Sequence, residues 1–460
     1  MGWSQADREK LSIFGRYYTG NVRAAATDAL KYTTGEQFDP DLSVIALFAL
    51  YHLGDFEGAY QCLRTLADKK DQFGGRSDYQ LSGALICQAA NRMNEVKPFI
   101  DTARHLAPTD SVVALNAYAM YFELGDLEAF TALNDEFDRG TFPLDQTGFA
   151  VATVALAQGD YPRGFQFLEH RYSMAEAHRY LNKGLFPNPR WRGEPLNGKT
   201  LLISAEQGLG DTIQLARYLP ELGELGAKNI LVEVQAEALP LLESNFPSLR
   251  FLERKYAEAP SAQFDLWTGT MSLPHLLGTT VANVPRRDGY LRVPHDNRAY
   301  WADRVASLAR PGKPRIGLAW SGQPSHRADR RRSIPPWKMF ERIRAINANF
   351  FAVQTEVPDI YPGNLISITD ELITLSDTAA LIEQMDLVIT VDTSVVHIAG
   401  AIGKETWLLL PYRYEWRWGL KGEANPWYES VKVIRQTATG DWNSVLADVF
   451  DRRLPARFLL

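Results

Sequence analysis

The residues with the clearest chemical meaning follow an apolar run, where Leu387–Gly403 reads LVITVDTSVVHIAGAIG. This pattern predicts a buried strand, a polar turn and a helix of small residues. In open α/β sheets, ligands bind where strands end and helices begin, because the first helical N–H groups are unpaired and attract anions. Thr393 and Ser394 can donate to phosphate oxygens, whereas Asp392 repels phosphate and suits a sugar hydroxyl. With His397 on the first helical turn, the segment fits a nucleotide-like ligand.

A purely structural role is the alternative for this segment. Asp392 and Thr393 can cap the helix, and His397 can pack against the sheet. These residues alone leave both interpretations open.

A second group of polar residues lies in Glu206–Leu219, EQGLGDTIQLARYL. Gly208 and Gly210 allow a sharp turn and a close approach of ligand to backbone. Asp211 then stands at the end of a predicted strand, where it can act as a general base toward an incoming hydroxyl. It can equally cap the helix that begins near Thr212.

A third group follows the predicted strand at residues 315–320 and contains four arginines, Arg327, Arg330, Arg331 and Arg332. Guanidinium groups bind phosphate oxygens and can neutralise a leaving diphosphate, so no metal ion is expected. Because charge runs are usually solvated, one or two of these arginines are expected to face the ligand, and Arg332 is preferred. The residues expected to bind the same nucleotide-like ligand here are Trp320, Ser321, Gly322, Arg332, Ser333 and Gln354.

The elements that position these groups alternate between strand and helix from Thr200 onward. Strands are predicted at residues 200–205, 229–234, 249–253, 315–320, 350–354, 387–391, 406–410 and 432–435. Alternation implies parallel sheets with right-handed crossovers. A Pro- and Arg-rich run at about residues 285–315 separates two such sets, which predicts two Rossmann-like lobes facing each other across a cleft.

One phosphate-binding motif is misleading. Residues 193–200, GEPLNGKT, match the Walker A pattern. A phosphate loop follows a strand and opens a helix, whereas here Thr200 begins a strand. ATP hydrolysis is therefore not expected.

The first third of the chain is repetitive. Helix-breaking pairs recur at Gly20-Asn21, Gly54-Asp55, Gly125-Asp126 and Gly159-Asp160, with a degenerate Met93-Asn94 between them. Their spacing is that of tetratricopeptide repeats, in which helical hairpins stack and a concave side binds extended peptide or protein. A helical bundle that serves as a brace is the alternative.

Composition excludes several classes of protein. The chain has 460 residues, 45% hydrophobic content and a net charge of −6, without a long basic run, which argues against nucleic-acid binding. Cys62 and Cys87 lack metal-ligand spacing and are expected to be buried. No signal peptide or bilayer-spanning run is found, so a cytoplasmic protein without a membrane span is expected.

Four segments together resemble bacterial proteins in which tetratricopeptide repeats are fused to a heptosyltransferase-like glycosyltransferase domain. They are PRWRGEPLNGKTLLISAEQGLGDTIQLARYLPEL, FDLWTGTMSLPHLLGTT, GLAWSG followed by RRSIP, and LVITVDTSVVHIAGAIGKETWLLLP with EWRWG. The resemblance covers about residues 187–436 and implies an α + α/β protein with a GT-B domain of two Rossmann-like lobes. By position, Asp211 in the Gly210-Asp211 loop becomes the base, and Asp392, Thr393 and His397 lie at the donor. Many heptosyltransferases place a lysine at the phosphates, where this chain offers Arg332.

These observations predict repeats at residues 1–175, a linker at 176–199, an acceptor-side lobe at 200–310 and a nucleotide-sugar lobe at 311–460. The expected activity is a metal-independent, inverting transfer of a sugar to Ser or Thr hydroxyls of a protein held by the repeats. No cofactor is expected, because the nucleotide-sugar is a substrate. The resemblance suggests flagellin as acceptor. Transfer to lipopolysaccharide or another glycan, and a repeat scaffold with an inactive transferase domain, are the alternatives. Trp416, Trp418 and Trp427 either contact substrate or pack.

Overall fold

The computed structural model describes the chain except residues 1–3, 174–185, 256–257, 288, 324–328, 413–414, 439 and 460. It forms two compact units, Met1–Val151 and Ala152–Leu460. In the part of the chain that is described, no helix is long and apolar enough to cross a membrane.

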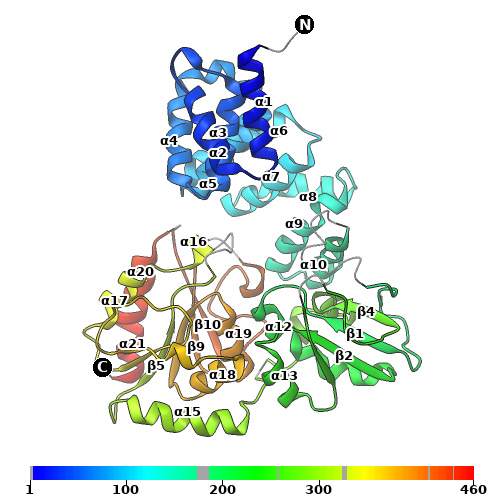
Figure 1. Cartoon of the computed structure of the whole chain (residues 1–460), viewed down its shortest axis with the longest axis vertical. Helices are drawn as coiled ribbons and strands as arrows, with labels where there is room; N and C mark the ends of the chain where they lie inside the picture. Colours follow the sequence, from blue (N-terminus) through cyan, green and yellow to red (C-terminus); the bar gives the residue numbers. More distant parts are fainter. Residues whose placement is uncertain are drawn as a thin grey trace. The chain divides into compact units, whose positions relative to one another are not determined.

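The first unit consists of helical hairpins (Figure 1). Its helices are α1 (Gln5–Tyr18), α2 (Val22–Ala29), α3 (Pro40–His52), α4 (Phe56–Leu66), α5 (Ser77–Ala89), α6 (Met93–Leu106), α7 (Ser111–Leu124) and α8 (Leu127–Asp138). The next helix, α9 (Leu144–Ala157), spans the division, and α10 (Tyr161–Leu168) belongs to the second unit. The predicted helical hairpins are confirmed, whereas their assignment as tetratricopeptide repeats stays a prediction. Cys62 and Cys87 are buried and unpaired, as expected.

The Gly-Asp pairs have a physical explanation. Gly54, Gly125 and Gly159 have φ angles of 73°, 70° and 86°, the left-handed conformation that ends a helix and that glycine adopts most readily. The aspartate that follows each glycine caps the next helix by accepting a backbone N–H, as Asp55 does from Gly58. In the third hairpin Asn91 has the left-handed conformation, with φ 68°. The predicted marker Met93-Asn94 is therefore displaced, since Met93 already begins α6.

The second unit contains two sheets in which every strand pairing is parallel. The first holds β1 (Thr200–Ser204), β2 (Asn229–Val234), β3 (Arg250–Glu253) and β4 (Leu266–Gly269). The second holds β5 (Arg315–Ala319), β6 (Asn349–Ala352), β7 (Leu365–Ile366), β8 (Leu387–Val391), β9 (Thr406–Leu410) and β10 (Val431–Arg435). All eight predicted strands are confirmed. β4 and β7 were not predicted, because one is a four-residue run ending in glycine and the other has two residues.

Both sheets have Rossmann-like strand order, which confirms the two predicted lobes. The order is β3-β2-β1-β4 in the first sheet and β10-β9-β8-β5-β6-β7 in the second. In each sheet the direction of winding reverses beside the first strand, and ligands of such sheets bind outside the carboxyl ends of the strands at this point. The switch points lie between β1 and β4 and between β5 and β8.

Helices cover the second sheet on both faces. Figure 1 shows α17 (Pro336–Ile343), α20 (Trp442–Ala447) and α21 (Leu454–Phe458) on one side, and α18 (Leu375–Glu383) and α19 (Ser394–Ala401) on the other. The core beneath the first group contains strand residues together with helix residues such as Met339, Trp442 and Phe450.

Two segments near the predicted domain boundaries pack against parts of the chain to which the prediction did not assign them. α15 (His295–Leu308) precedes residue 310 but packs against α18, where the Trp301 indole N–H donates to Asp377 at 3.3 Å. The predicted linker lies partly outside the described residues. Its described end docks on β4, since the Trp191 N–H donates to the Trp267 carbonyl at 2.7 Å. The Walker-like residues 193–200 lead into β1, which begins at Thr200, and open no helix.

Replacing Gly125 by alanine tests the turn chemistry. No neighbour lies within 4 Å of the added methyl group, so the cost is conformational and should be about 1–2 kcal/mol of unfolding free energy. Gly15 is the matched control, because it lies inside α1 with equal space around it. Gly15→Ala should instead stabilise by about 0.5–1 kcal/mol. Urea unfolding of the full chain measures both, and effects of the same sign would contradict this explanation.

Candidate active site

Hydrogen bonds join the loops that follow β5 and β6. Gln354 lies just after β6, and its Oε1 accepts from the backbone N–H groups of Trp320 at 2.7 Å and Ser321 at 3.2 Å. Its Nε2 donates to the Ser321 hydroxyl at 3.1 Å. The Gly322 N–H donates to the Ser333 hydroxyl at 3.0 Å. These predicted donor-binding residues therefore lie together at the carboxyl edge of the second sheet.

Arg332 connects this group to the turn after β8. Its Nη1 donates to the Asp392 carbonyl at 2.7 Å, and its Nε lies 3.3 Å from Asp329. The segment after β5 also passes close to the guanidinium, since a Cβ on Gly322 would lie 2.6 Å from Arg332 Nη2. Arg332 thus spans the switch point between β5 and β8. Arg327 and the side chain of Arg330 lie outside the described residues.

The turn after β8 has the predicted strand-turn-helix form. Thr393 caps α19, because its hydroxyl accepts from the Val395 N–H at 3.4 Å, and Ser394 is the first helical residue. Burial raises the pKa of Asp392, and the charges of Arg417 and Arg332 oppose that shift. The capping alternative is therefore observed for Thr393, while Asp392 carries a partly desolvated carboxyl group.

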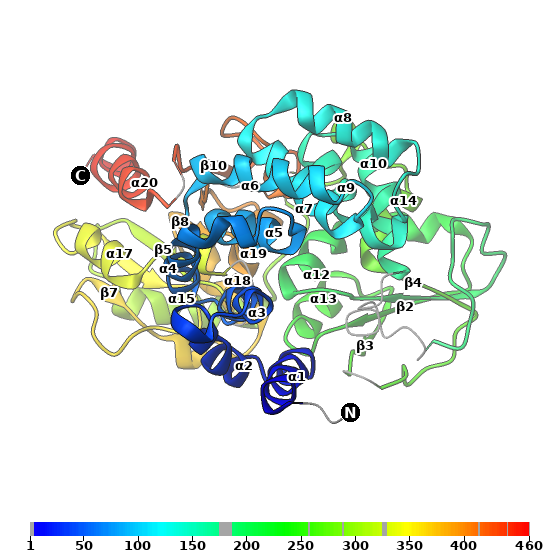
Figure 2. The same ribbon diagram turned by 90° about the horizontal axis from the view of Figure 1, so that it is seen from above.

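His397 is buried where the two lobes meet. Its Nδ1 lies 2.9 Å from the Tyr428 hydroxyl, and its ring stacks on Trp418 with centroids 5.3 Å apart. Burial lowers the pKa of His397 well below its ordinary value, so the imidazole is neutral at physiological pH. A Cβ on Gly210, from the first lobe, would lie 2.7 Å from its ring. Only glycine fits this approach, and Figures 1 and 2 show α12 (Leu209–Leu215) and α19 side by side.

Asp211 uses one carboxylate oxygen within its own lobe and one toward the second lobe. The helix α12 begins at Leu209 and not near Thr212, so Asp211 is its third residue and not its N-cap. Its Oδ2 accepts from the N–H of the N-cap residue Gly208 at 3.0 Å. Its Oδ1 forms an ion pair with Arg417, which belongs to the second lobe. The carboxylate thus has a capping contact and also faces the second lobe.

Arg417 is a site residue that the sequence did not single out, although it lies at the centre of the segment EWRWG, which belongs to the resemblance. Its Nε donates to Gln214 at 2.8 Å, and its Nη1 pairs with Glu415. The only sequence signal is a loop arginine between two tryptophans. Trp416, Trp418 and Trp427 are buried and pack against neighbouring rings.

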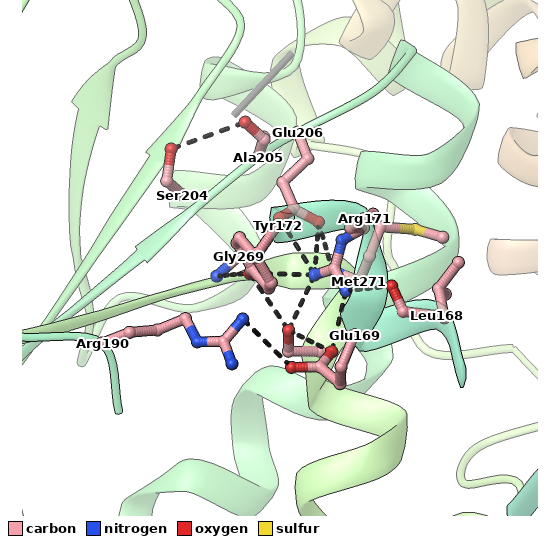
Figure 3. Close-up of polar contacts among 11 residues, drawn as sticks. Leu168, Glu169, Arg171, Tyr172, Arg190, Ser204, Ala205, Glu206, Gly269 and Met271 are labelled. Carbon is pink, nitrogen blue, oxygen red and sulfur yellow. Dashed lines mark hydrogen bonds and ion pairs between the residues drawn. The ribbon is translucent and has the colours of Figure 1, made fainter. Parts of the chain in front are cut away.

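The corresponding edge of the first lobe is filled by protein. Figure 3 shows the Arg171 guanidinium among the side chains of Glu206, Glu169 and Tyr172. Arg171 Nη2 lies 3.0 Å from both oxygens of Glu206, and Nη1 lies 2.8 Å from Glu169. Arg171 lies in η4 (Glu169–Tyr172), the turn that directly follows α10. The last hairpin therefore occupies the switch point of the first sheet.

Glu206 connects this network to the segment between β1 and α12, the helix that carries Asp211. It lies two residues after the end of β1, and its Oε2 accepts from the Met271 N–H, after β4, at 3.1 Å. A Cβ on Gly269 would collide with the Glu206 carboxyl group, so that position requires glycine. Arg171 could not have been found from local spacing, because Glu206 is 35 residues away. Among the described residues, no three His, Cys, Asp or Glu side chains gather as a metal-ligand set.

Replacing Arg171 by methionine should strongly destabilise the second unit. The change leaves the buried Glu206 and Glu169 without their cation, which should cost about 3–5 kcal/mol of unfolding free energy. Arg298→Met is the control, because the Arg298–Glu383 pair is largely exposed and should cost about 0–1 kcal/mol. Denaturant unfolding of both full-length variants measures the difference, and equal losses would contradict a role for the buried network.

Comparison with known proteins gives distant relatives. No protein-family model matches the sequence. The chain is 28% identical over 400 residues to Protein FlbA of Caulobacter vibrioides, which covers 80% of this chain and 65% of FlbA, so the chain spans about two thirds of that relative. A glycosyl transferase family 9 structure from Veillonella parvula aligns at 13% identity over 56% of this chain and 91% of its own, with a TM-score of 0.39. The E. coli ADP-heptose lipopolysaccharide heptosyltransferase II aligns at 14% identity over 56% of this chain and 98% of its own, also with a TM-score of 0.39.

Proposed function

We propose that this protein is a glycosyltransferase that moves a sugar from a nucleotide-sugar donor to a hydroxyl group of a protein. The observation that carries the proposal is the contact between two helices. The first turn of α12, with Gly210 and Asp211, abuts α19, which carries His397, directly beside the Asp392 turn. A candidate base is thereby held next to a turn suited to a nucleotide-sugar.

In the proposed reaction the acceptor oxygen attacks the anomeric carbon as its proton passes to Asp211. The bond from that carbon to the phosphate oxygen breaks, and the nucleoside diphosphate leaves with the electron pair. A single displacement inverts the anomeric centre. Arg332, Thr393 and Ser394 stand where they can stabilise the departing phosphate, an electrostatic effect that strengthens in a dry cleft.

The protein acceptor is supported by the helical hairpins of the first unit. Such hairpins commonly present extended surfaces to peptides or proteins. Flagellin is the acceptor that the sequence resemblance suggests, and Ser or Thr supplies the hydroxyl. Transfer to lipopolysaccharide or another glycan is the second candidate, in which the hairpins act as a brace. Arg171 and Glu206 occupy the switch point of the first sheet, where a small glycan acceptor would otherwise bind. This occupancy favours the protein acceptor.

The variant Asp211→Asn tests the activity and the base together. Asparagine keeps an oxygen for the Gly208 N–H but cannot accept the proton, so transfer should fall by about a hundredfold or more. Intact mass of flagellin from cells with the native protein, without it, and with the variant measures both acceptor and sugar. Asp296→Asn, at an exposed position, is the control and should modify normally. A normal mass shift with Asp211→Asn would exclude Asp211 as the base.

A shortened chain tests the role of the hairpins. A chain starting near residue 187 would lack Arg171, the cation that pairs with Glu206, so the cut belongs before α9, near residue 140. The shortened protein should melt cooperatively and bind the nucleotide-sugar but fail to modify intact acceptor protein. Modification as efficient as that by the whole chain would return the hairpins of the first unit to the role of a brace.

A further inference from the structure

The turn η9 (Trp416–Trp418) directs three consecutive side chains toward three different parts of the second unit, as expected for three residues per turn. Trp416 packs against Trp427 with ring centroids 5.9 Å apart, and Trp418 stacks on His397. Arg417 extends to α12 of the first lobe. The two tryptophans are buried, so they fix the turn from which the arginine projects.

The Arg417 guanidinium contacts two residues on one face of α12. Its Nη2 pairs with Asp211, and its Nε donates to Gln214 at 2.8 Å. Residues three apart lie on the same side of a helix, so one planar guanidinium can reach both. The contact joins residues that are 206 positions apart in the chain. It therefore links the candidate base directly to the donor-side lobe.

Glu415 orients this arginine from its own side. Its Oε2 accepts from the Arg417 backbone N–H at 2.8 Å, and its Oε1 pairs with Nη1. The Trp416 ring lies 4.2 Å from the guanidinium carbon. The side chains of Arg417 and Asp211 are only 12% and 16% exposed, so water weakens their attraction little. Arg417 is thus held in place by Glu415 and Trp416 as well as by Asp211.

We propose that Arg417 is a positioning residue, which holds the Asp211 carboxylate oriented toward the acceptor while the donor-side lobe is closed on the first lobe. This inference rests on the proposed function, in which Asp211 is the base. A closed cleft then assembles the base and the donor turn together, which couples donor binding to acceptor activation.

The groups around Arg417 show what its removal would change. Asp392 and Glu415 face the same guanidinium as Asp211. Without that guanidinium, Asp211 keeps its contact with the Gly208 N–H but loses its contact with the second lobe. The carboxylate should therefore lose its fixed orientation toward the acceptor.

The test compares Arg417→Gln and Arg417→Lys in the full chain, using the acceptor and sugar donor that the mass experiment identifies. Arg417→Gln should lower kcat by roughly 10- to 100-fold, because a catalytic group misplaced by about 1 Å can cost that much. Arg417→Lys keeps a cation that can contact Asp211, so it should recover part of the rate. Arg298→Gln, which removes an exposed ion pair, should match the native protein.

The outcomes separate this inference from the proposed function. A native chain that transfers no sugar, or an active Asp211→Asn variant, removes the proposed function and with it the role of Arg417. If Asp211→Asn is inactive while Arg417→Gln has the native rate, only the inference fails. Equal rate losses in both Arg417 variants, with intact cooperative melting, would show that Arg417 only braces the turn and would also overturn the inference.

Discussion

The close approach of α12 to α19 is the contact on which the rest of the site depends. Gly210 leaves room for the His397 ring, and any larger side chain would hold the helices apart. Each helix begins at the carboxyl edge of its own sheet. Their contact therefore brings the ends of β1 and β8 together, with Asp211 on one side and Asp392 on the other. The candidate site of the two Rossmann-like lobes lies at this junction.

Buried polar groups surround the junction at a cost in stability. Removing charges from water is expensive, and a buried ion pair often stabilises a fold less than apolar residues of similar volume would. Arg171 and Arg417 nevertheless hold Glu206 and Asp211 in defined positions. Both carboxylates belong to the same loop and helix after β1. This placement is consistent with selection for the geometry of that segment, since catalytic groups must be held by a rigid surrounding shell.

The sequence predicts the elements better than it predicts the contacts between them. Strands such as β8 and β9 are buried along their whole length, so their apolar runs are visible without any structure. The Gly-Asp pairs are equally visible, because each glycine ends one helix and each aspartate begins the next. The marker predicted at Met93-Asn94 lies instead at Asn91, where asparagine takes the left-handed conformation and glycine is absent.

The clustering of the donor-binding candidates was also predictable, since the segments that follow β5, β6 and β8 meet at the same edge of the second sheet. Arg417 and Arg171 were not, because their partners are distant in sequence and no spacing rule connects them. The packing of η4 into the first lobe was hidden for the same reason. Long-range ion pairs thus account for most of what the sequence did not reveal about the site.

A structure of the full chain with a bound nucleoside diphosphate tests the central claim most directly. The account predicts the diphosphate at the switch point between β5 and β8, with its terminal phosphate near Arg332 and the Thr393–Ser394 turn and directed toward Asp211. A nucleotide bound at the carboxyl edge of the first sheet, or one whose terminal phosphate points away from Asp211, would contradict it.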